Sequence, residues 1–226
     1  MEILHVDANL IVIDKPAGLS VLGDGWETDS VYITRLLEAD FGRVWVVHRL
    51  DKGTTGVLVL ARTEEAHRAL SMQFERHEAV KIYHAIACGS PPWEDYTTRN
   101  PLRLNVGHKH RTAIDQSRGK PSTTTFHVLE RLREHTLLEV RPLTGRTHQV
   151  RAHAAWLHFP LLGDVLYGAP PTELIARHAL HAFSLTFNDP HTGSPRTFTA
   201  PRPTDFESAL SSLRGRRKRA KEQREE

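Results

Sequence analysis

The sequence predicts a mixed α+β fold whose strands pair mainly antiparallel. Short apolar runs separated by turn residues dominate the first half of the chain. A few helical patterns stand among these runs, and neighbouring strands are repeatedly joined by short turns. This order favours a single α+β domain, with a sheet flanked by helices, over a doubly wound parallel sheet.

The first half of the chain begins with a predicted hairpin of residues 3–6 and 10–13, and the pair Lys15-Pro16 ends its second strand. Asp29 is predicted to cap a helix that ends at Phe41. Strands are expected on both sides of a polar loop at 48–56. A second helix is predicted from the capping residue Thr63 to about His77.

The second half begins with a strand over residues 81–87, followed by loops and short strands up to Pro121. The remaining elements are an antiparallel strand pair, a helix, a hairpin and a short last helix, over residues 123–132 with 136–140, 147–157, 178–187 with 196–199, and 204–213.

Composition indicates a soluble globular protein. The chain has 226 residues, of which 39% are hydrophobic and 25% charged. No apolar stretch approaches the roughly 20 residues needed to cross a membrane, and the N-terminus lacks the pattern of a signal peptide. Cys88 is the only cysteine, so a cytoplasmic protein without disulfides is expected.

The net charge of +3 is concentrated at the C-terminus. Residues 214–226 contain seven basic and three acidic residues, which leaves 23 basic and 24 acidic residues in the rest of the chain. We therefore predict a folded domain over 1–213 and a basic, flexible tail over 214–226. A second basic cluster at 99–120, which includes Lys109, could attract phosphates or form a solvated loop.

The segment His48-Arg49-Leu50-Asp51, with apolar strands before and after it, is the first candidate for chemistry. A carboxylate on a short loop between two strands can act as a nucleophile or a base, but it needs a partner that keeps it ionised and aimed. Arg146 is a candidate partner, because a guanidinium pairs bidentately with a carboxylate. The alternatives are a solvated loop for Asp51, and phosphate positioning or solvation of a helix start for Arg146.

Other residue types narrow the chemistry. Tyr83 offers a stacking face and a hydroxyl that suit a flipped-out base, although a strand tyrosine can also be a sheet residue. His148, His153 and His158 recur every five residues, so neighbours lie about 140° apart on a helix and do not share a face. No two-histidine metal motif, dinucleotide-binding glycine motif or P-loop is present in the sequence.

Six blocks together resemble the RluA-type family of pseudouridine synthases. They stand in the family's order between residue 1 and about residue 205: Asp14–Leu19, His48–Asp51 with Thr54–Gly56, Lys81–Tyr83, Thr144–Arg151, Leu161–Gly168 and Leu180–Ala182. The resemblance implies the pseudouridine synthase fold with an RNA-binding cleft across its sheet. It also implies an enzyme that flips specific uridines out of rRNA or tRNA and converts them to pseudouridine without cofactor or metal.

The resemblance also implies roles for the matching residues. Asp51 would be the essential aspartate, acting as nucleophile or base, and Arg146 would pair with it and orient it. Tyr83 would stack on the uracil and could help remove the C5 proton. Arg49 would fill the space that the flipped nucleotide leaves. His48, Lys81 and Arg151, in the same blocks, are expected to contact RNA.

Two departures from the family pattern stand out. The blocks begin almost at Met1, which predicts a stand-alone catalytic domain without the S4-type RNA-binding domain that many members carry. His158 stands where the family usually has a glycine, so a turn with positive φ would form less easily there. We expect a monomer whose partner is RNA, with no membrane and no nucleotide cofactor. The alternatives are a catalytically idle RNA-binding protein and a metal-dependent hydrolase that uses the histidines.

Overall fold

The chain divides into two units in the computed structural model, which describes residues 1–23, 31–107 and 111–225. Unit 1 comprises Met1–Lys81 and Ala182–Pro201, and unit 2 comprises Ile82–His181 and Arg202–Glu226. The chain passes between the units inside two strands and just after Pro201. Because the first two boundaries lie within strands, the sequence shows no linker at those positions.

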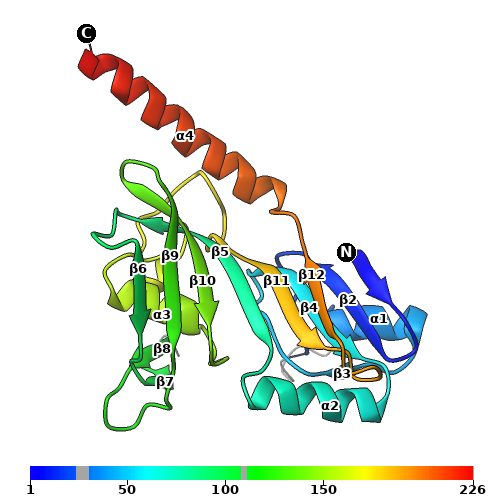
Figure 1. The fold of residues 1–226 in the computed structure, drawn as a ribbon. Helices are drawn as coiled ribbons and strands as arrows, with labels where there is room; N and C mark the ends of the chain where they lie inside the picture. Colours follow the sequence, from blue (N-terminus) through cyan, green and yellow to red (C-terminus); the bar gives the residue numbers. More distant parts are fainter. Residues whose placement is uncertain (24–30, 108–110, 226) are drawn as a thin grey trace. The chain divides into compact units, whose positions relative to one another are not determined.

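Unit 1 contains a sheet with the strand order β1-β2-β4-β11, to which β3 and β12 are added (Figure 1). The β1-β2, β2-β4, β3-β4 and β11-β12 pairs are antiparallel. Its elements are β1 (Glu2–Val6), β2 (Leu10–Lys15), α1 (Ile33–Phe41), β3 (Trp45–Val46), β4 (Thr55–Ala61), α2 (Glu64–Glu75), most of β11 (Leu180–Asn188) and β12 (Pro195–Thr199). The predicted first hairpin is confirmed. Its turn is closed by the Asp7 carboxylate, which accepts hydrogen bonds from the N–H groups of Asn9 and Leu10 at 2.8 and 2.9 Å.

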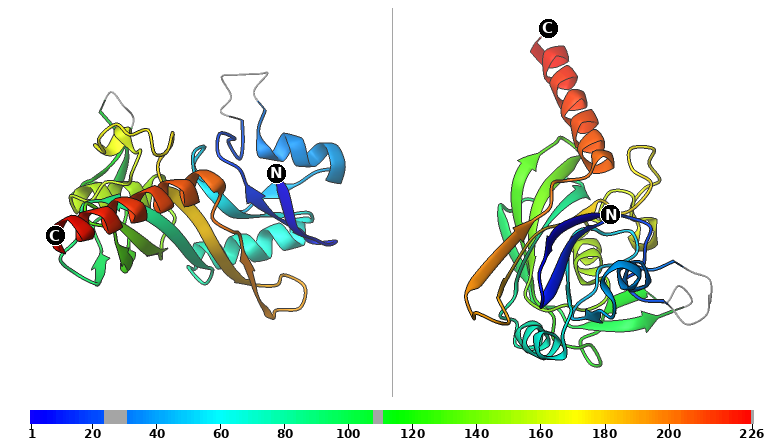
Figure 2. Two further views of the ribbon diagram at one scale, coloured as in Figure 1. Left: turned by 90° about the horizontal axis from the view of Figure 1, so that it is seen from above. Right: turned by 90° about the vertical axis from the view of Figure 1, so that its right-hand side faces the viewer.

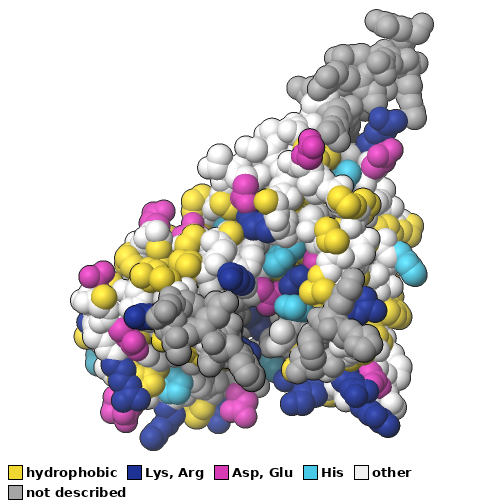
Figure 3. All heavy atoms as spheres, turned by 180° about the vertical axis from the view of Figure 1, so that it is seen from behind, with side chains coloured by type: hydrophobic (Ala, Val, Ile, Leu, Met, Phe, Trp, Pro, Cys, Tyr) yellow, Lys and Arg dark blue, Asp and Glu magenta, His cyan; other side chains and the backbone are white. Residues whose placement is uncertain are grey.

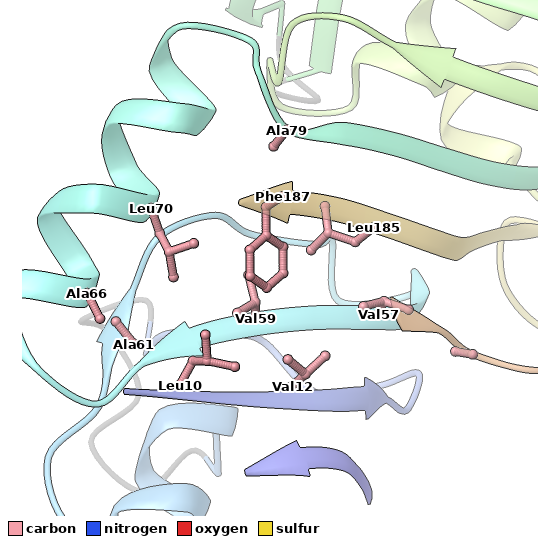
Figure 4. Close-up of a cluster of buried hydrophobic side chains, with 11 residues drawn as sticks. Leu10, Val12, Val57, Val59, Ala61, Ala66, Leu70, Ala79, Leu185 and Phe187 are labelled. Carbon is pink, nitrogen blue, oxygen red and sulfur yellow. The ribbon is translucent and has the colours of Figure 1, made fainter. Parts of the chain in front are cut away.

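The core of unit 1 lies between its sheet and α2 (Figure 4). Leu70 on α2 and Val59 on β4 are fully buried, and Phe187 on β11 is 2% exposed. Each such side chain contributes roughly 1.5–3 kcal/mol through its removal from water. This packing fixes β4, the strand that follows the Asp51 loop.

The two helices of unit 1 compare differently with the prediction. The α2 cap is confirmed, because the Thr63 hydroxyl accepts a hydrogen bond from the Ala66 N–H at 3.1 Å. Helix α1 ends at Phe41 as predicted but begins only at Ile33. The proposed cap Asp29 lies outside the described residues.

Unit 2 contains the antiparallel strand order β5-β10-β9-β6 and a separate β7-β8 pair. Its elements are β5 (Val80–Cys88, from Ile82 onward), β6 (Asp95–Thr98), β7 (Leu102–Val106), β8 (Arg111–Ile114), β9 (Thr124–Arg131), β10 (His135–Pro142), α3 (Gln149–Trp156), the 3-10 helix η1 (Val165–Tyr167), the start of β11, and α4 (Thr204–Glu225). The mixed, mainly antiparallel α+β architecture is confirmed in both units.

Two helices of unit 2 differ from the sequence prediction. Helix α3 begins at Gln149 rather than Thr147, because His148 adopts a left-handed conformation with φ of 53°. Helix α4 does not end at Leu213 but continues to Glu225, so the predicted tail is helical. Arg214, its first basic residue, pairs with Glu130 at 2.6 Å.

The basic cluster at 99–120 lies around the β7-β8 pair. Arg103 pairs with Asp115 at 3.2 Å, and the other four described basic residues are exposed: Arg99, Arg111, Arg118 and Lys120. His108, Lys109 and His110 lie outside the described residues. In the part of the chain that the structure describes, no helix is long and apolar enough to span a membrane.

Candidate active site

The loop that carries Asp51 joins β3 to β4 in unit 1. Leu50 is 7% exposed, so its buried side chain anchors the loop. Arg49 is exposed and Asp51 is half-buried. The Thr54 N–H donates to the Asp51 carbonyl at 2.9 Å and closes a tight turn. The predicted arrangement, a polar loop between two strands, is therefore confirmed.

Lys15, at the end of β2, holds this turn from inside the protein. Its side chain is fully buried, and the ammonium donates to the carbonyl oxygens of Pro16 at 2.8 Å, Lys52 at 3.3 Å and Thr54 at 2.9 Å. The Gly18 N–H also donates to the Lys52 carbonyl, at 2.8 Å. A buried ammonium is tolerated only when its donors are satisfied, so the backbone around Asp51 is held in one conformation.

The imidazole of His48 is engaged by the protein. Its Nε2 accepts a hydrogen bond from the Val59 N–H at 3.2 Å, and its ring stacks on Phe74 with centroids 4.5 Å apart. Burial, with a smaller contribution from the charge of Lys81, lowers the pKa of His48 to about 3. A neutral ring fixed in this way favours a role in positioning the loop.

Lys81 is the last residue of unit 1 before the chain continues into unit 2 along β5. It is half-buried, and burial lowers its pKa to about 8. The ammonium therefore remains largely protonated at neutral pH.

Gly56 brings together two of the motif blocks, the one that ends at Gly56 and the one at Leu180–Ala182. Its φ is +109°, and a Cβ atom at this position would lie 2.2 Å from the Ala182 carbonyl oxygen. Strands β4 and β11 approach so closely here that only glycine fits. The sequence predicted a polar loop that reaches residue 56, but Gly56 lies in strand β4.

In unit 2, the buried amide of Gln149 holds the turn that carries Arg146. Its Oε1 accepts from the Thr144 hydroxyl at 2.7 Å and from the Arg146 N–H at 3.0 Å. Its Nε2 donates to the Thr123 carbonyl and to the Thr124 hydroxyl, both at 2.9 Å. All four bonding positions of this amide are used, so the turn is tied to the start of β9.

The guanidinium of Arg146 is partly desolvated. Its Nε is buried, and among the described residues no acceptor lies within hydrogen-bonding distance of it. A buried N–H without an acceptor costs about 1–3 kcal/mol, and such exceptions often mark functional groups.

Tyr83 lies on β5 opposite Val140 of β10. Its half-buried side chain packs against a core cluster that includes Ala85, Phe126 and Val150. His84, the next residue, points to the other face of the sheet and is buried. The ring of Tyr83 is therefore supported from one side by the core of unit 2.

Arg151 forms a buried ion pair. Its Nε and Nη2 donate to the two carboxylate oxygens of Asp164 at 2.7 and 2.9 Å, and its side chain is 8% exposed. The guanidinium also lies over the ring of Tyr167, at 5.0 Å from the centroid. This geometry favours a structural role over the RNA contact suggested by the sequence.

The three histidines spaced five residues apart have different surroundings. His153 is fully buried; its Nδ1 is bonded to the Thr124 hydroxyl at 2.8 Å and its Nε2 to the Asn100 carbonyl at 2.9 Å. His148 bonds the Tyr167 hydroxyl at 3.1 Å, and His158 is exposed. Within residues 1–23, 31–107 and 111–225, no three His, Cys, Asp or Glu residues are grouped so that they could hold a metal ion.

Sequence reasoning missed the residues that support the candidate groups. Lys15 and Gln149 stand inside recognised blocks, and that position is the only signal that could have found them.

On the surface, Lys and Arg side chains are interspersed with Asp and Glu over the face shown in Figure 3. This mixture agrees with the near-neutral charge of residues 1–213.

Comparisons with known proteins agree on one family. The family model described as RNA pseudouridylate synthase matches residues 9–156. Ribosomal large subunit pseudouridine synthase D of Pseudomonas aeruginosa is 37% identical over 95% of this chain and 72% of its own length. The protein of the same name from Xanthomonas campestris is 37% identical over 98% and 72%.

A solved structure supports the same assignment. Human RNA pseudouridylate synthase domain containing 4 has a TM-score of 0.79 and 27% identity, and the match covers 94% of this chain and 93% of the human chain. The motif blocks, the two structural units and these matches together show that the chain belongs to the RNA pseudouridylate synthase family and is a pseudouridine synthase, an isomerase that acts on RNA.

Proposed function

We propose that this enzyme isomerises specific uridines of ribosomal RNA and that Asp51 is its essential carboxylate. The relatives from Pseudomonas aeruginosa and Xanthomonas campestris are named for the large ribosomal subunit, which favours rRNA over tRNA. The observation that carries the proposal for Asp51 is the buried Lys15 ammonium, which fixes the backbone of the Asp51 loop. Three carbonyl groups in and next to its loop share the buried Lys15 ammonium, whereas a merely solvated loop needs no such support.

The reaction needs one carboxylate close to the ribose. The bond between N1 of uracil and C1′ breaks, the uracil rotates, a bond forms between C5 and C1′, and the C5 proton is lost while N1 gains one. Asp51 serves either by attacking C1′ or by removing a ribose proton, and both routes require it to be ionised when the target nucleotide arrives.

The other candidate residues support this step. The Arg146 guanidinium pairs with Asp51 and orients it, and its buried Nε is a donor for such a partner. Tyr83 stacks on the flipped uracil, where an aromatic face contributes roughly 1–3 kcal/mol. Arg49, exposed on the Asp51 loop, enters the RNA stack, and Lys81 contacts a phosphate.

Two further candidates act through their neighbours. His48 positions the Asp51 loop through Val59 and Phe74, and Arg151 positions helix α3 through Asp164. The enzyme works as a monomer in the cytoplasm, a reducing compartment that suits a chain with one half-buried cysteine.

The test is Asp51→Asn, assayed as tritium release from C5 of labelled uridine in unmodified ribosomal RNA transcripts. Turnover should fall below detection, while RNA affinity stays equal or rises slightly because one negative charge is removed. Asp40→Asn, an exposed change on α1, is the matched control and should keep full activity. Substantial turnover by Asp51→Asn would refute the assignment.

Arg146 is tested in the same assay. Arg146→Ala should lower kcat at least about a hundredfold, as expected for loss of one oriented charged donor. Arg146→Lys should recover part of the loss, because it keeps the charge but not the bidentate fork. Conversion confined to transfer RNA transcripts would contradict the choice of rRNA, and RNA binding without any conversion would favour an idle RNA-binding protein.

A further inference from the structure

Tyr167, the last residue of η1, carries a hydroxyl that is buried inside unit 2. The residue is 8% exposed, and it packs in a core cluster with Leu102 and Ala152. A phenolic hydroxyl buried among apolar side chains is unfavourable unless it forms hydrogen bonds. A phenylalanine would fill the same space without that requirement, so the bonds of the hydroxyl decide what Tyr167 does.

The hydroxyl lies between strand β8 and the residue that precedes helix α3. Its oxygen accepts a hydrogen bond from the Thr112 N–H at 2.9 Å and lies 3.1 Å from Nδ1 of His148. Burial raises the pKa of Tyr167, so the phenol keeps its proton at neutral pH and can donate it to Nδ1. Figure 2 shows η1 (yellow, left-hand view) beside strands β7 and β8 (green).

A third hydrogen bond closes a ring of bonds through this hydroxyl. The Thr112 hydroxyl donates to the Thr147 carbonyl at 2.9 Å, and Thr147 is joined to His148 by the peptide bond. Thr112 is 2% exposed, so the bonds that it makes are largely shielded from water. Hydrogen bonds that share partners in a low-dielectric interior strengthen one another. Residues 147 and 148 are therefore held against β8.

His148 needs such support because its backbone lies in the left-handed region. Its φ is 53° and its ψ is 20°, a conformation that residues with a Cβ atom rarely adopt. Strained residues persist only where their surroundings fix them, and they cluster at functional sites. His148 stands two residues after Arg146, and its carbonyl accepts the Ala152 N–H at 2.8 Å as helix α3 begins. The conformation of His148 therefore sets the course of the chain from the Arg146 turn into the helix.

The Arg146 turn is thus supported on both sides. Gln149 accepts from the Arg146 N–H and ties it to the start of β9. The ring of hydrogen bonds through Tyr167 ties the next two residues to β8. Arg151 keeps the tyrosine in place, because its guanidinium lies over the Tyr167 ring and pairs with Asp164.

We propose that Tyr167 is a positioning residue for the isomerisation, because its hydroxyl holds His148, and thereby Arg146, in the conformation that the reaction requires. The proposal rests on the proposed role of Arg146 as the partner of Asp51. A displacement of about 1 Å at a reacting group can reduce the rate about a hundredfold. Loss of one of several supports should displace Arg146 by less than this, so an intermediate loss of rate is expected.

The test is Tyr167→Phe, which removes one oxygen atom and keeps the ring beneath Arg151. In the tritium-release assay kcat should fall about tenfold, while KM for the rRNA transcript stays within about twofold because the buried hydroxyl contacts no RNA. Tyr96→Phe, the same change at an exposed tyrosine of β6, is the matched control and should keep the parent kcat. Exchange of the Thr112 amide hydrogen, followed by NMR, should be faster in Tyr167→Phe and unchanged in Tyr96→Phe.

The double variant Arg146→Ala with Tyr167→Phe shows whether the effect passes through Arg146. Rates are measured in single turnovers with excess enzyme, so that slow variants can be compared. If Tyr167 acts only through Arg146, the double variant should be as slow as Arg146→Ala alone. Losses that multiply would show that the hydroxyl acts elsewhere, and they would overturn the proposal.

A parent-like kcat in Tyr167→Phe, together with faster exchange at Thr112, would also contradict it, because the hydroxyl would then serve stability alone. Thr112→Val is a second variant, which removes only the bond to the Thr147 carbonyl. Its kcat should fall about threefold with KM unchanged, and a parent-like kcat would count against the ring of hydrogen bonds. Failure of the proposed function appears separately, as near-normal turnover in Arg146→Ala alone.

Discussion

The Asp51 loop of unit 1 and the Arg146 turn of unit 2 are held by opposite means. The loop that carries the acid rests on a buried cation, Lys15, which binds three backbone carbonyls. The turn that carries the guanidinium rests on a neutral amide, Gln149, which makes four hydrogen bonds. In both, the support grips the main chain beside the reactive side chain.

The difference lies in what each support costs when it is broken. A buried ammonium is expensive to desolvate, and its bonds to carbonyl dipoles offset that cost. A buried amide is cheaper to desolvate, and each of its bonds contributes about 1 kcal/mol. The support of the Asp51 loop should therefore be the more sensitive of the two.

The largest expected effect follows from Lys15→Met. Three carbonyl groups lose their shared donor, although that of Lys52 keeps the Gly18 N–H. A buried carbonyl left without a donor costs about 1–3 kcal/mol. We expect the free energy of unfolding to fall by about 3–5 kcal/mol in denaturant titrations, with activity reduced even where the protein remains folded. Lys52→Met, an exposed change in the same loop, should cost less than about 0.5 kcal/mol. A tolerated Lys15→Met would reverse the ranking of the two supports.

Gln149→Ala should come second, at about 2–3 kcal/mol, because it removes all four bonds but leaves no buried charge. Gln149→Glu keeps the acceptor for the Arg146 N–H and loses the donors to Thr123 and Thr124. The Gln149→Glu variant should therefore preserve more activity than Gln149→Ala. If the two variants were equally active, the amide would not be what positions Arg146.

Low pH should destabilise unit 1, whereas the hydrogen bonds of the neutral Gln149 amide in unit 2 do not depend on pH in this way. Burial alone would raise the pKa of Asp7, but hydrogen bonds with His5, two backbone N–H groups and Arg196 outweigh it and lower the pKa to about 2. Burial would also raise the pKa of Asp189, but the hydrogen bond from Arg196 and two backbone N–H groups lower this pKa to about 2. Groups with depressed pKa values stabilise the fold above the ordinary pKa, near 3.8, and lose that contribution as the pH falls to about 2.

Allowing for partial exposure, we expect about 2 kcal/mol of stability to be lost across this window. Urea titrations at stepwise lower pH measure it. Arg196→Met removes the shared partner, so it should flatten the acid limb of the curve. An unchanged slope in Arg196→Met would show that these ion pairs do not contribute.

The smallest effect concerns α3, which follows the Arg146 turn. His158 has a φ of +68° just after the helix end, a conformation that costs a residue with a Cβ atom about 1 kcal/mol. His158→Gly should therefore raise the free energy of unfolding by about 0.5–1 kcal/mol, measured by thermal unfolding. His158→Ala retains the Cβ and should bring no such gain.

Local signals in the sequence predicted much of the fold. The turn residues after Val6 predicted the first hairpin, and Thr63 predicted the start of α2, because caps and turns depend on a few neighbouring residues. The family motifs identified the enzyme class. The left-handed turn at His158, doubtful from the sequence because the family has glycine there, does form.

Other features depend on distant residues and could not be read locally. A lysine is normally exposed. The sequence around Lys15 therefore does not predict that this residue is buried and bonded to the carbonyls of residues 52 and 54. The need for Gly56 arises from Ala182, far along the chain. Helix α4 was predicted too short because its apolar pattern ends at Leu213, although good helix-forming residues follow.

The first segment of unit 2, Ile82–His181, lies in the sequence between the two segments of unit 1, and this order has a consequence for synthesis. Strand β4 ends at Ala61, but its neighbour β11 is not translated until residues 180–188. At about 5–20 residues per second, the ribosome leaves that apolar edge uncovered for on the order of ten seconds. During this interval the nascent chain exposes a strand suited to wrong pairing, so we expect chaperones to be more important for its yield than for that of a chain made in contiguous units.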